Sequence, residues 1–304
     1  MTNGGESLRT VVVAGSVNLG VAAAKAITGL LSGSAAMLSE AVHSLADTTT
    51  EVLLFVAVRR GAAPPDESHQ FGYGRAGFLW ALVAAAFTFV AGGGFAVTQG
   101  IHTILHGDVD SHFGPSFAVL GIAFVLESIS LTQGLRQARG EAAGLRLGVS
   151  RYLRYTTNTA VKAVVFEDLA ALTGLVLAAF GLGLTMLTGS PLWDGSASIG
   201  IGLLLFVVGA NLVRANASLL IGQAVPAVMQ RHIHDELLAL PEIEKVEQLF
   251  TSVIGMSDVV VAARVKFADA ATAHAITAAA DEAERRLSQR FPSIRYVFLD
   301  PTSV

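Results

Sequence analysis

Six long runs of apolar residues follow one another through most of the chain, over residues 10–31, 35–60, 77–104, 112–138, 160–188 and 194–222. Each run exceeds the roughly 18 apolar residues that an α-helix needs to cross the hydrocarbon core of a bilayer. The pattern therefore predicts a mainly α protein with a six-helix transmembrane domain over residues 10–222.

The pattern changes after this domain. Residues 227–240 and 271–290 have helical spacing, whereas Ile243–Val253, Val259–Phe267 and Ser293–Leu299 read as strands. In the second of these strands, apolar positions alternate with Ala262, Arg264 and Lys266. The order αββαβ predicts a small ferredoxin-like α+β domain over residues 223–304. Because about 80 residues make a small core, a homodimer partner would help to stabilise it.

The composition agrees with a membrane protein. Of the 304 residues, 52% are hydrophobic and only 14% are charged, against about 25% charged in an ordinary soluble domain. The net charge of −4 gives no reason to expect a nucleic-acid partner. The chain has no cysteine, which excludes disulfides and thiolate metal sites. Nothing in the composition indicates a prosthetic group.

Basic residues predict the orientation, because they concentrate in cytoplasmic loops. They flank the link between the second and third runs and crowd the link between the fourth and fifth, whereas the other links carry Asp108, Asp110 and Asp194. Both termini are therefore expected in the cytoplasm, with residues 1–9 as a short N-terminal segment. The Ala- and Gly-rich composition, with no transit peptide apparent, favours a bacterial plasma membrane.

A histidine and three acids share one face of the second run. Glu40, His43, Asp47 and Glu51 follow one another at intervals of three or four residues, so their side chains project to the same side of a helix. An ionisable group at membrane depth is costly, about 2.5–3.5 kcal/mol on insertion scales, and by default marks a functional site. Histidine with carboxylate suits a divalent transition metal, which makes His43 and Asp47 the first candidate ligands.

Further candidates lie in other segments. Glu167 and Asp168 stand within the apolar fifth run, where a cation would neutralise them, and adjacent residues on a helix point about 100° apart. Glu127 in the fourth run is an outer ligand, a proton carrier or the partner of a buried base such as Lys162 or Lys25. In residues 64–75, PPDESHQFGYGR, Asp66 and His69 form either a structural turn or a metal entry site.

Two motifs carry a family resemblance: SGSAAMLSEAVHSLADTTTEVLL at residues 32–54 and PPDESHQFGYGR at residues 64–75. Together with six spans and an α+β tail, they resemble the cation diffusion facilitator family, and the branch that includes animal mitochondrial zinc transporters. The resemblance implies a dimeric exporter of Zn²⁺ in exchange for protons, with paired ligands from the second and fifth helices. By position these are His43 and Asp47, then Val164 and Asp168. Val164 replaces the usual histidine, and Glu167 is an additional acid.

The expected function is therefore divalent metal efflux by Zn²⁺/H⁺ antiport and alternating access. An oxygen-rich site would also admit Mn²⁺, Fe²⁺ or Co²⁺ as substrates. The fourth ligand is left open between Glu167, Glu127 and water. One alternative is a non-transporting accessory subunit of a related transporter, favoured by the missing histidine. An enzyme is not expected, because the sequence contains no His-Glu-x-x-His metalloprotease motif.

Overall fold

The computed structural model describes residues 4–107, 113–144, 148–156, 158–256 and 258–302. Its contacts divide the chain into two compact units, one of residues 1–57 and 80–215 and the other of residues 58–79 and 216–304. The second unit thus contains the link between the second and third apolar runs as well as the C-terminal domain.

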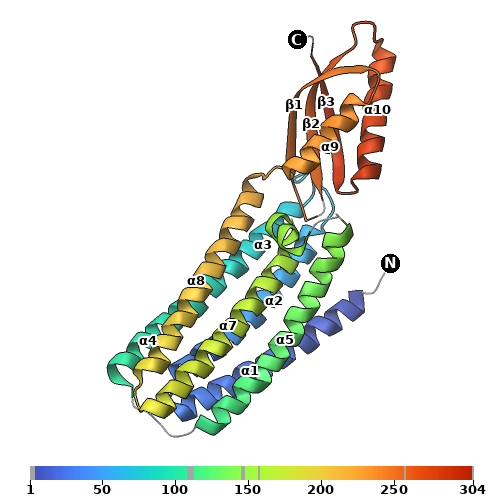
Figure 1. Cartoon of the computed structure of the whole chain (residues 1–304). Coiled ribbons are helices and arrows are strands. Elements are labelled where there is room, and N and C mark those ends of the chain that lie inside the picture. Colours follow the sequence, from blue (N-terminus) through green and yellow to red (C-terminus); the bar gives the residue numbers. More distant parts are fainter. Residues whose placement is uncertain (1–3, 108–112, 145–147, 157, 257, 303–304) are drawn as a thin grey trace. The chain divides into compact units, whose positions relative to one another are not determined.

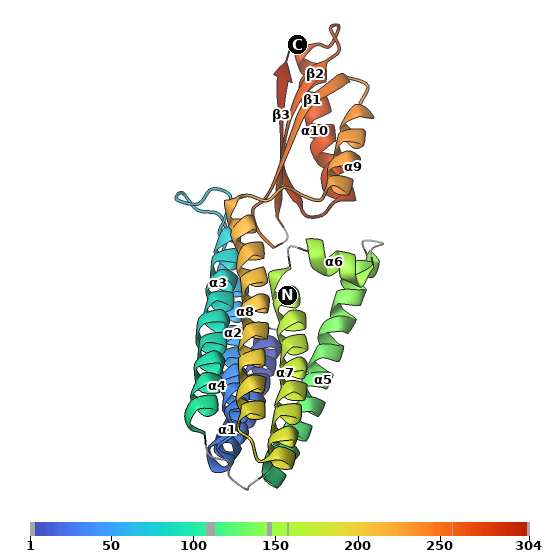
Figure 2. The same cartoon turned by 60° about the vertical axis from the view of Figure 1, so that its left-hand side comes forward.

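The transmembrane domain is built from long helices that run side by side (Figures 1 and 2). They are α1 (Gly4–Ser32), α2 (Ala35–Gly61), α3 (Gly74–Phe87) continued by a π-helical turn η1 (Thr88–Gly93) and α4 (Gly94–His106), α5 (Phe113–Gly144), α7 (Thr159–Thr188) and α8 (Leu192–Ile221). Among the described residues, five of these segments are long and apolar enough to cross a membrane. With α1 they correspond to the six predicted spans. A short helix, α6 (Val149–Tyr155), was not predicted.

Small residues allow α8 to pack closely against the segment formed by α3, η1 and α4. A Cβ atom on Gly93 would lie 2.6 Å from the Phe206 ring, and one on Gly92 would lie 3.1 Å from Leu205. Both positions therefore require glycine for this close approach. At Gly94, by contrast, a Cβ would meet nothing within 4 Å.

The C-terminal domain has the predicted αββαβ order: α9 (Ala227–Leu238), β1 (Ile243–Val253), β2 (Val259–Phe267), α10 (Ala273–Arg290) and β3 (Ile294–Thr302). The sheet order is β1-β2-β3, with β1 antiparallel and β3 parallel to β2. Both helices cover the same face of this sheet (Figure 2). Val261, Ala263 and Val265 are buried in the core against them, as the alternation in β2 predicts.

The opposite face of the sheet carries an exposed apolar row. Phe250 of β1 pairs with Ala262 of β2, which pairs with Phe298 of β3. The two phenylalanines are 61% and 51% exposed. Tyr296 shares this face, and Phe71 from the α2–α3 link meets its ring edge-on with 5.3 Å between the ring centroids. The link therefore packs on the domain's uncovered sheet face.

Candidate metal transport site

The centre of the candidate site is the pair His43 and Asp47 on α2. The imidazole is 1% exposed and the carboxylate 16%, and His43 Nδ1 lies 3.3 Å from Asp47 Oδ1. This geometry does not make a hydrogen bond: Nδ1 and Nε2 of His43 and Oδ1 of Asp47 are all buried without a partner. Buried polar atoms are normally paired, so unpaired ones require an explanation such as an ion. These three are nitrogen and oxygen atoms that suit a divalent metal.

The fifth apolar run brings two acids to this region, on different sides of α7. Asp168 faces α5, where it accepts a hydrogen bond of 2.8 Å from the hydroxyl of Ser130. Val164, one turn earlier, lies on the same side near Gly134 of α5. The aspartate that the resemblance selects is thus bonded to α5 in this structure.

Glu167 projects from a different side of α7 than Asp168 does. Its side chain is buried, its Oε1 has no hydrogen-bond partner, and its charge interacts with that of Asp47. Asp47 interacts in the same way with Glu127 of α5. Glu167, which the resemblance leaves only as an extra acid, is thus the described α7 acid with a buried oxygen that has no partner. As the helices stand, no three His, Asp or Glu side chains in the described part of the chain are close enough to share an ion.

Several polar contacts set the rotation of α2 around the pair. On the α1 side, Asn18 donates to Glu51 at 2.8 Å, and Lys25 donates to both Glu40 and Ser44. The partner of Lys25 is therefore Glu40, and not Glu127, which was one predicted possibility. These contacts hold one carboxylate oxygen of Glu40 and one of Glu51 against α1, whereas both ring nitrogens of His43 and Oδ1 of Asp47 have no partner.

Asp194 holds the first turn of α2. The sequence analysis counted it with the link between the fifth and sixth runs, whereas it lies in the first turn of α8 and is 3% exposed. Its carboxylate accepts hydrogen bonds from the hydroxyl of Ser34 at 2.6 Å and from the backbone N–H groups of Ala35 and Ala36. A carboxylate at a helix N-terminus also interacts favourably with the helix dipole. The start of α2 is thus capped by a residue from another helix.

The predicted entry site in the α2–α3 link is internally satisfied. Asp66 accepts hydrogen bonds from the backbone N–H groups of Ser68 and His69 and from the hydroxyl of Tyr73. These bonds hold the pKa of the Asp66 carboxyl below its usual range, with the Tyr73 hydroxyl as the largest cause. The ring of His69 lies 4.1 Å from that of Tyr73. This is the geometry of a structural turn, and the metal entry role stays a prediction.

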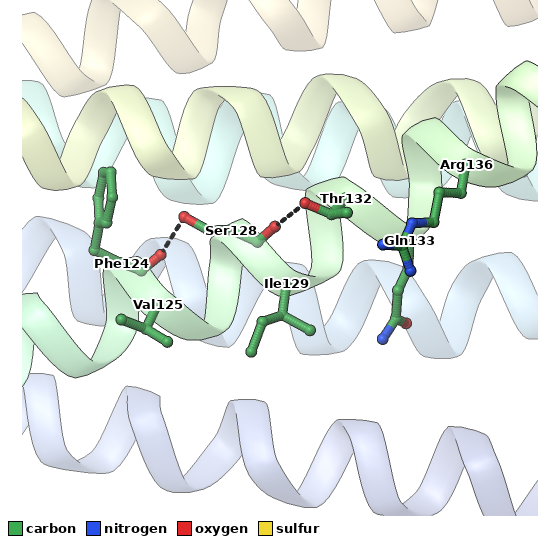
Figure 3. Close-up of a pocket in the computed structure, with 7 residues that line it drawn as sticks. All are labelled: Phe124, Val125, Ser128, Ile129, Thr132, Gln133 and Arg136. Carbon is green, nitrogen blue, oxygen red and sulfur yellow. Dashed lines mark hydrogen bonds between the residues drawn. The ribbon is translucent and has the colours of Figure 1, made fainter.

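A groove along α5 is a separate feature. Its lining includes Phe124, Val125 and Ile129 beside Ser128, Thr132, Gln133 and Arg136, as Figure 3 shows. The two hydroxyls donate to carbonyl groups of their own helix, which makes them compatible with a lipid environment. The groove lining contains no acid or histidine and so offers no ligands for a metal cation.

Comparison with protein families identifies the family to which this helical bundle belongs. Residues 11–221 match the model of the cation efflux transmembrane domain. The chain belongs to the cation efflux family. This membership confirms the resemblance that the two motifs carry. Together with the long apolar helices, it shows that the protein is a multi-pass membrane protein.

Relatives of this chain include proteins from an animal, a plant and a bacterium. It is 31% identical to the mitochondrial proton-coupled zinc antiporter SLC30A9 of Xenopus laevis, over 80% of its own length and 44% of the relative's. It is 30% identical to metal tolerance protein C4 of Arabidopsis thaliana, over 64% of its own length and 42% of the relative's. It is 26% identical to magnetosome protein MamB of Magnetospira sp. (strain QH-2), over 64% of its own length and 61% of the relative's. The chain thus spans less than half the length of the first two relatives.

Proposed function

We propose that this protein exports Zn²⁺ from the cytoplasm in exchange for protons, by alternating access of the helical bundle. The observation that carries the proposal is the set of buried, unpartnered ligand atoms on His43, Asp47 and Glu167. The similarity to a protein named as a proton-coupled zinc antiporter supports zinc and protons as substrates. Mn²⁺, Fe²⁺ and Co²⁺ are further substrates to test, because carboxylates outnumber histidine in the set.

In this mechanism His43, Asp47 and Glu167 bind the metal, and Asp168 is the fourth ligand or an acid beside it. Metal loading draws α2 and α7 together, because no three ligands in the described residues meet without the ion. Metal binding requires deprotonated ligands, so protons arriving from the opposite side compete for the same atoms and release the metal. Glu127 and Glu51, with Glu40 and the link residues Asp66 and His69, remain predicted members of the proton or metal pathway.

We also propose a homodimer in a bacterial plasma membrane, with both termini in the cytoplasm. The exposed row of Phe250, Ala262 and Phe298 supports the dimer, because paired copies would remove these rings from water. Light scattering of the purified protein tests it. Phe298→Asp is expected to shift the mass from dimer to monomer, and an unchanged dimer would place the interface elsewhere.

Reconstituted liposomes provide the decisive test of transport. The protein is expected to move Zn²⁺ when a proton gradient is imposed, as read by a dye inside the vesicles. Asp47→Asn and Glu167→Gln are expected to abolish this flux. Thr49→Ala is the matched control on α2, because its exposed hydroxyl bonds only to a carbonyl of its own helix. Folded protein that moves none of the four metals would refute antiport and would favour the accessory-subunit alternative.

Asp168→Asn separates the two acids of α7. If Asp168 is a ligand, its variant should lose as much flux as Glu167→Gln. If it acts beside the site through α5, flux should fall only in part. Equal and complete retention of flux in both variants would refute the assignment of ligands to α7.

A further inference from the structure

A lysine is completely buried within the transmembrane domain, beside the transport site. Lys25 of α1 donates to Glu40 Oε2 at 3.0 Å and to the hydroxyl of Ser44 at 2.8 Å, and the side chains of Lys25 and Glu40 are both 0% exposed. Buried ion pairs contribute little net stability, because desolvation offsets their attraction. Charges at membrane depth more often serve function.

The pair lies directly against the residues proposed to bind metal. Glu40 is three residues before His43 on α2, and Ser44 follows His43. The charge of Lys25 interacts with His43, Asp47 and Glu127. The ammonium of Lys25 bonds Ser44, which adjoins His43, whereas Glu40 directs its second oxygen at Gly174 of α7. The positive end of the ion pair is therefore the end presented to the site.

The remaining oxygen of Glu40 shows how tightly the pair is enclosed. Oε1 has no hydrogen-bond partner and points at α7, where a Cβ atom on Gly174 would lie 2.2 Å from it. Glu40 is thus confined between α1 and α7 and keeps the ammonium group in place. Lys25 is consequently a fixed charge, which neither enters the site as a ligand nor reaches water.

We propose that Lys25 is a built-in counter-charge that weakens metal binding at the transport site enough for release. The proposal rests on the proposed transport function. An acidic site around Asp47, Glu127 and Glu167 would by itself hold a divalent cation tightly, and a transporter must also let its ion leave. A nearby positive charge raises the energy of the bound ion through direct repulsion, which is large where the dielectric constant is low. Glu40 moderates this repulsion.

Cobalt binding to the purified full chain in detergent tests the proposal. Co²⁺ is the probe because its visible absorption reports the ligand set while its titration gives the Kd. Lys25→Met is expected to lower the Kd by about tenfold or more with an unchanged spectrum. Glu40→Gln should raise the Kd, since it leaves the lysine unmoderated, and Lys25→Arg should stay near the wild type.

A double variant guards against misfolding, because each neutralising single variant leaves one buried charge uncompensated. Lys25→Met with Glu40→Gln removes both charges at similar volume. Its Kd should fall below that of the wild type, because the positive charge held at Ser44 beside His43 is removed. A wild-type Kd in the double variant would overturn the proposal and leave the ion pair with only a structural role, joining α1 to α2.

The same titration separates this proposal from the transport site itself. Asp47→Asn should lose Co²⁺ binding. Wild-type protein that binds no Co²⁺, or Asp47→Asn protein that binds it fully, would overturn the ligand assignment and the counter-charge with it. Normal wild-type binding with no response to the lysine variants would overturn the counter-charge alone.

Discussion

The cap that Asp194 places on α2 leads to a stability prediction for Asp194→Ala. The substitution leaves the Ser34 hydroxyl and the Ala35 N–H buried without an acceptor. Hydrogen bonds to a charged group contribute roughly 1.5–3 kcal/mol each. Removing the carboxylate also relieves its own desolvation, so the net loss in the free energy of unfolding is expected at about 3 kcal/mol.

Asp194→Asn is the informative companion variant. The amide keeps one oxygen as an acceptor for the first turn of α2 but loses the negative charge at the helix N-terminus. That charge contributes about 1 kcal/mol, so the asparagine variant should fall between alanine and the wild type. Ser128→Ala is the control, because the Ser128 hydroxyl bonds only within α5, and its effect should stay within about 0.5 kcal/mol.

Thermal unfolding in detergent, followed by the fluorescence of the two tryptophans, provides the assay. Trp193 adjoins Asp194 and reports on this end of α8. With a shift of about 2 °C in Tm per kcal/mol for a chain of this length, Asp194→Ala should lower Tm by about 6 °C and Asp194→Asn by about 2 °C. An unchanged Tm for the alanine variant would refute the cap, and equal losses in both variants would refute the separate contribution of the charge.

Four further substitutions test packing and charge. Gly93→Ala should lower the free energy of unfolding by about 1–3 kcal/mol, because its Cβ would press on the Phe206 ring. Gly94→Ala places its Cβ in open space and should be neutral or stabilising. Unfolding in detergent compares the two variants, and equal effects would contradict the packing. Gly74→Ala should destabilise the C-terminal unit, because its Cβ would lie 2.4 Å from a backbone carbonyl oxygen, and faster proteolysis there would show it. Two arginines hold the pKa of Glu282 at about 2, below its ordinary 4.5, so its stabilising effect is present above pH 4.5 and lost as the pH falls towards 2. The destabilisation by Glu282→Gln should therefore disappear over that range, and a pH-independent difference in Tm would contradict the ion pairs.

The sequence by itself determined the features that depend on local periodicity. The lengths of the apolar runs predicted the spans, and alternation in β2 predicted which side chains enter the core. The spacing of His43 and Asp47 placed both on one helical face, because positions four apart are neighbours on any α-helix. Two motifs were sufficient to identify the family, and the family model over residues 11–221 confirmed it.

Only the tertiary structure decided which side chains meet between helices. The resemblance selected Asp168 and left Glu167 as an extra acid, but packing bonded Asp168 to Ser130 of α5 and left an oxygen of Glu167 buried without a partner. It also paired Lys25 with Glu40, where the sequence had suggested Glu127 as one possible partner. The rotation of each helix about its own axis is set by the summed packing of all its neighbours. No local pattern records that sum, so contacts between distant segments had to come from the fold.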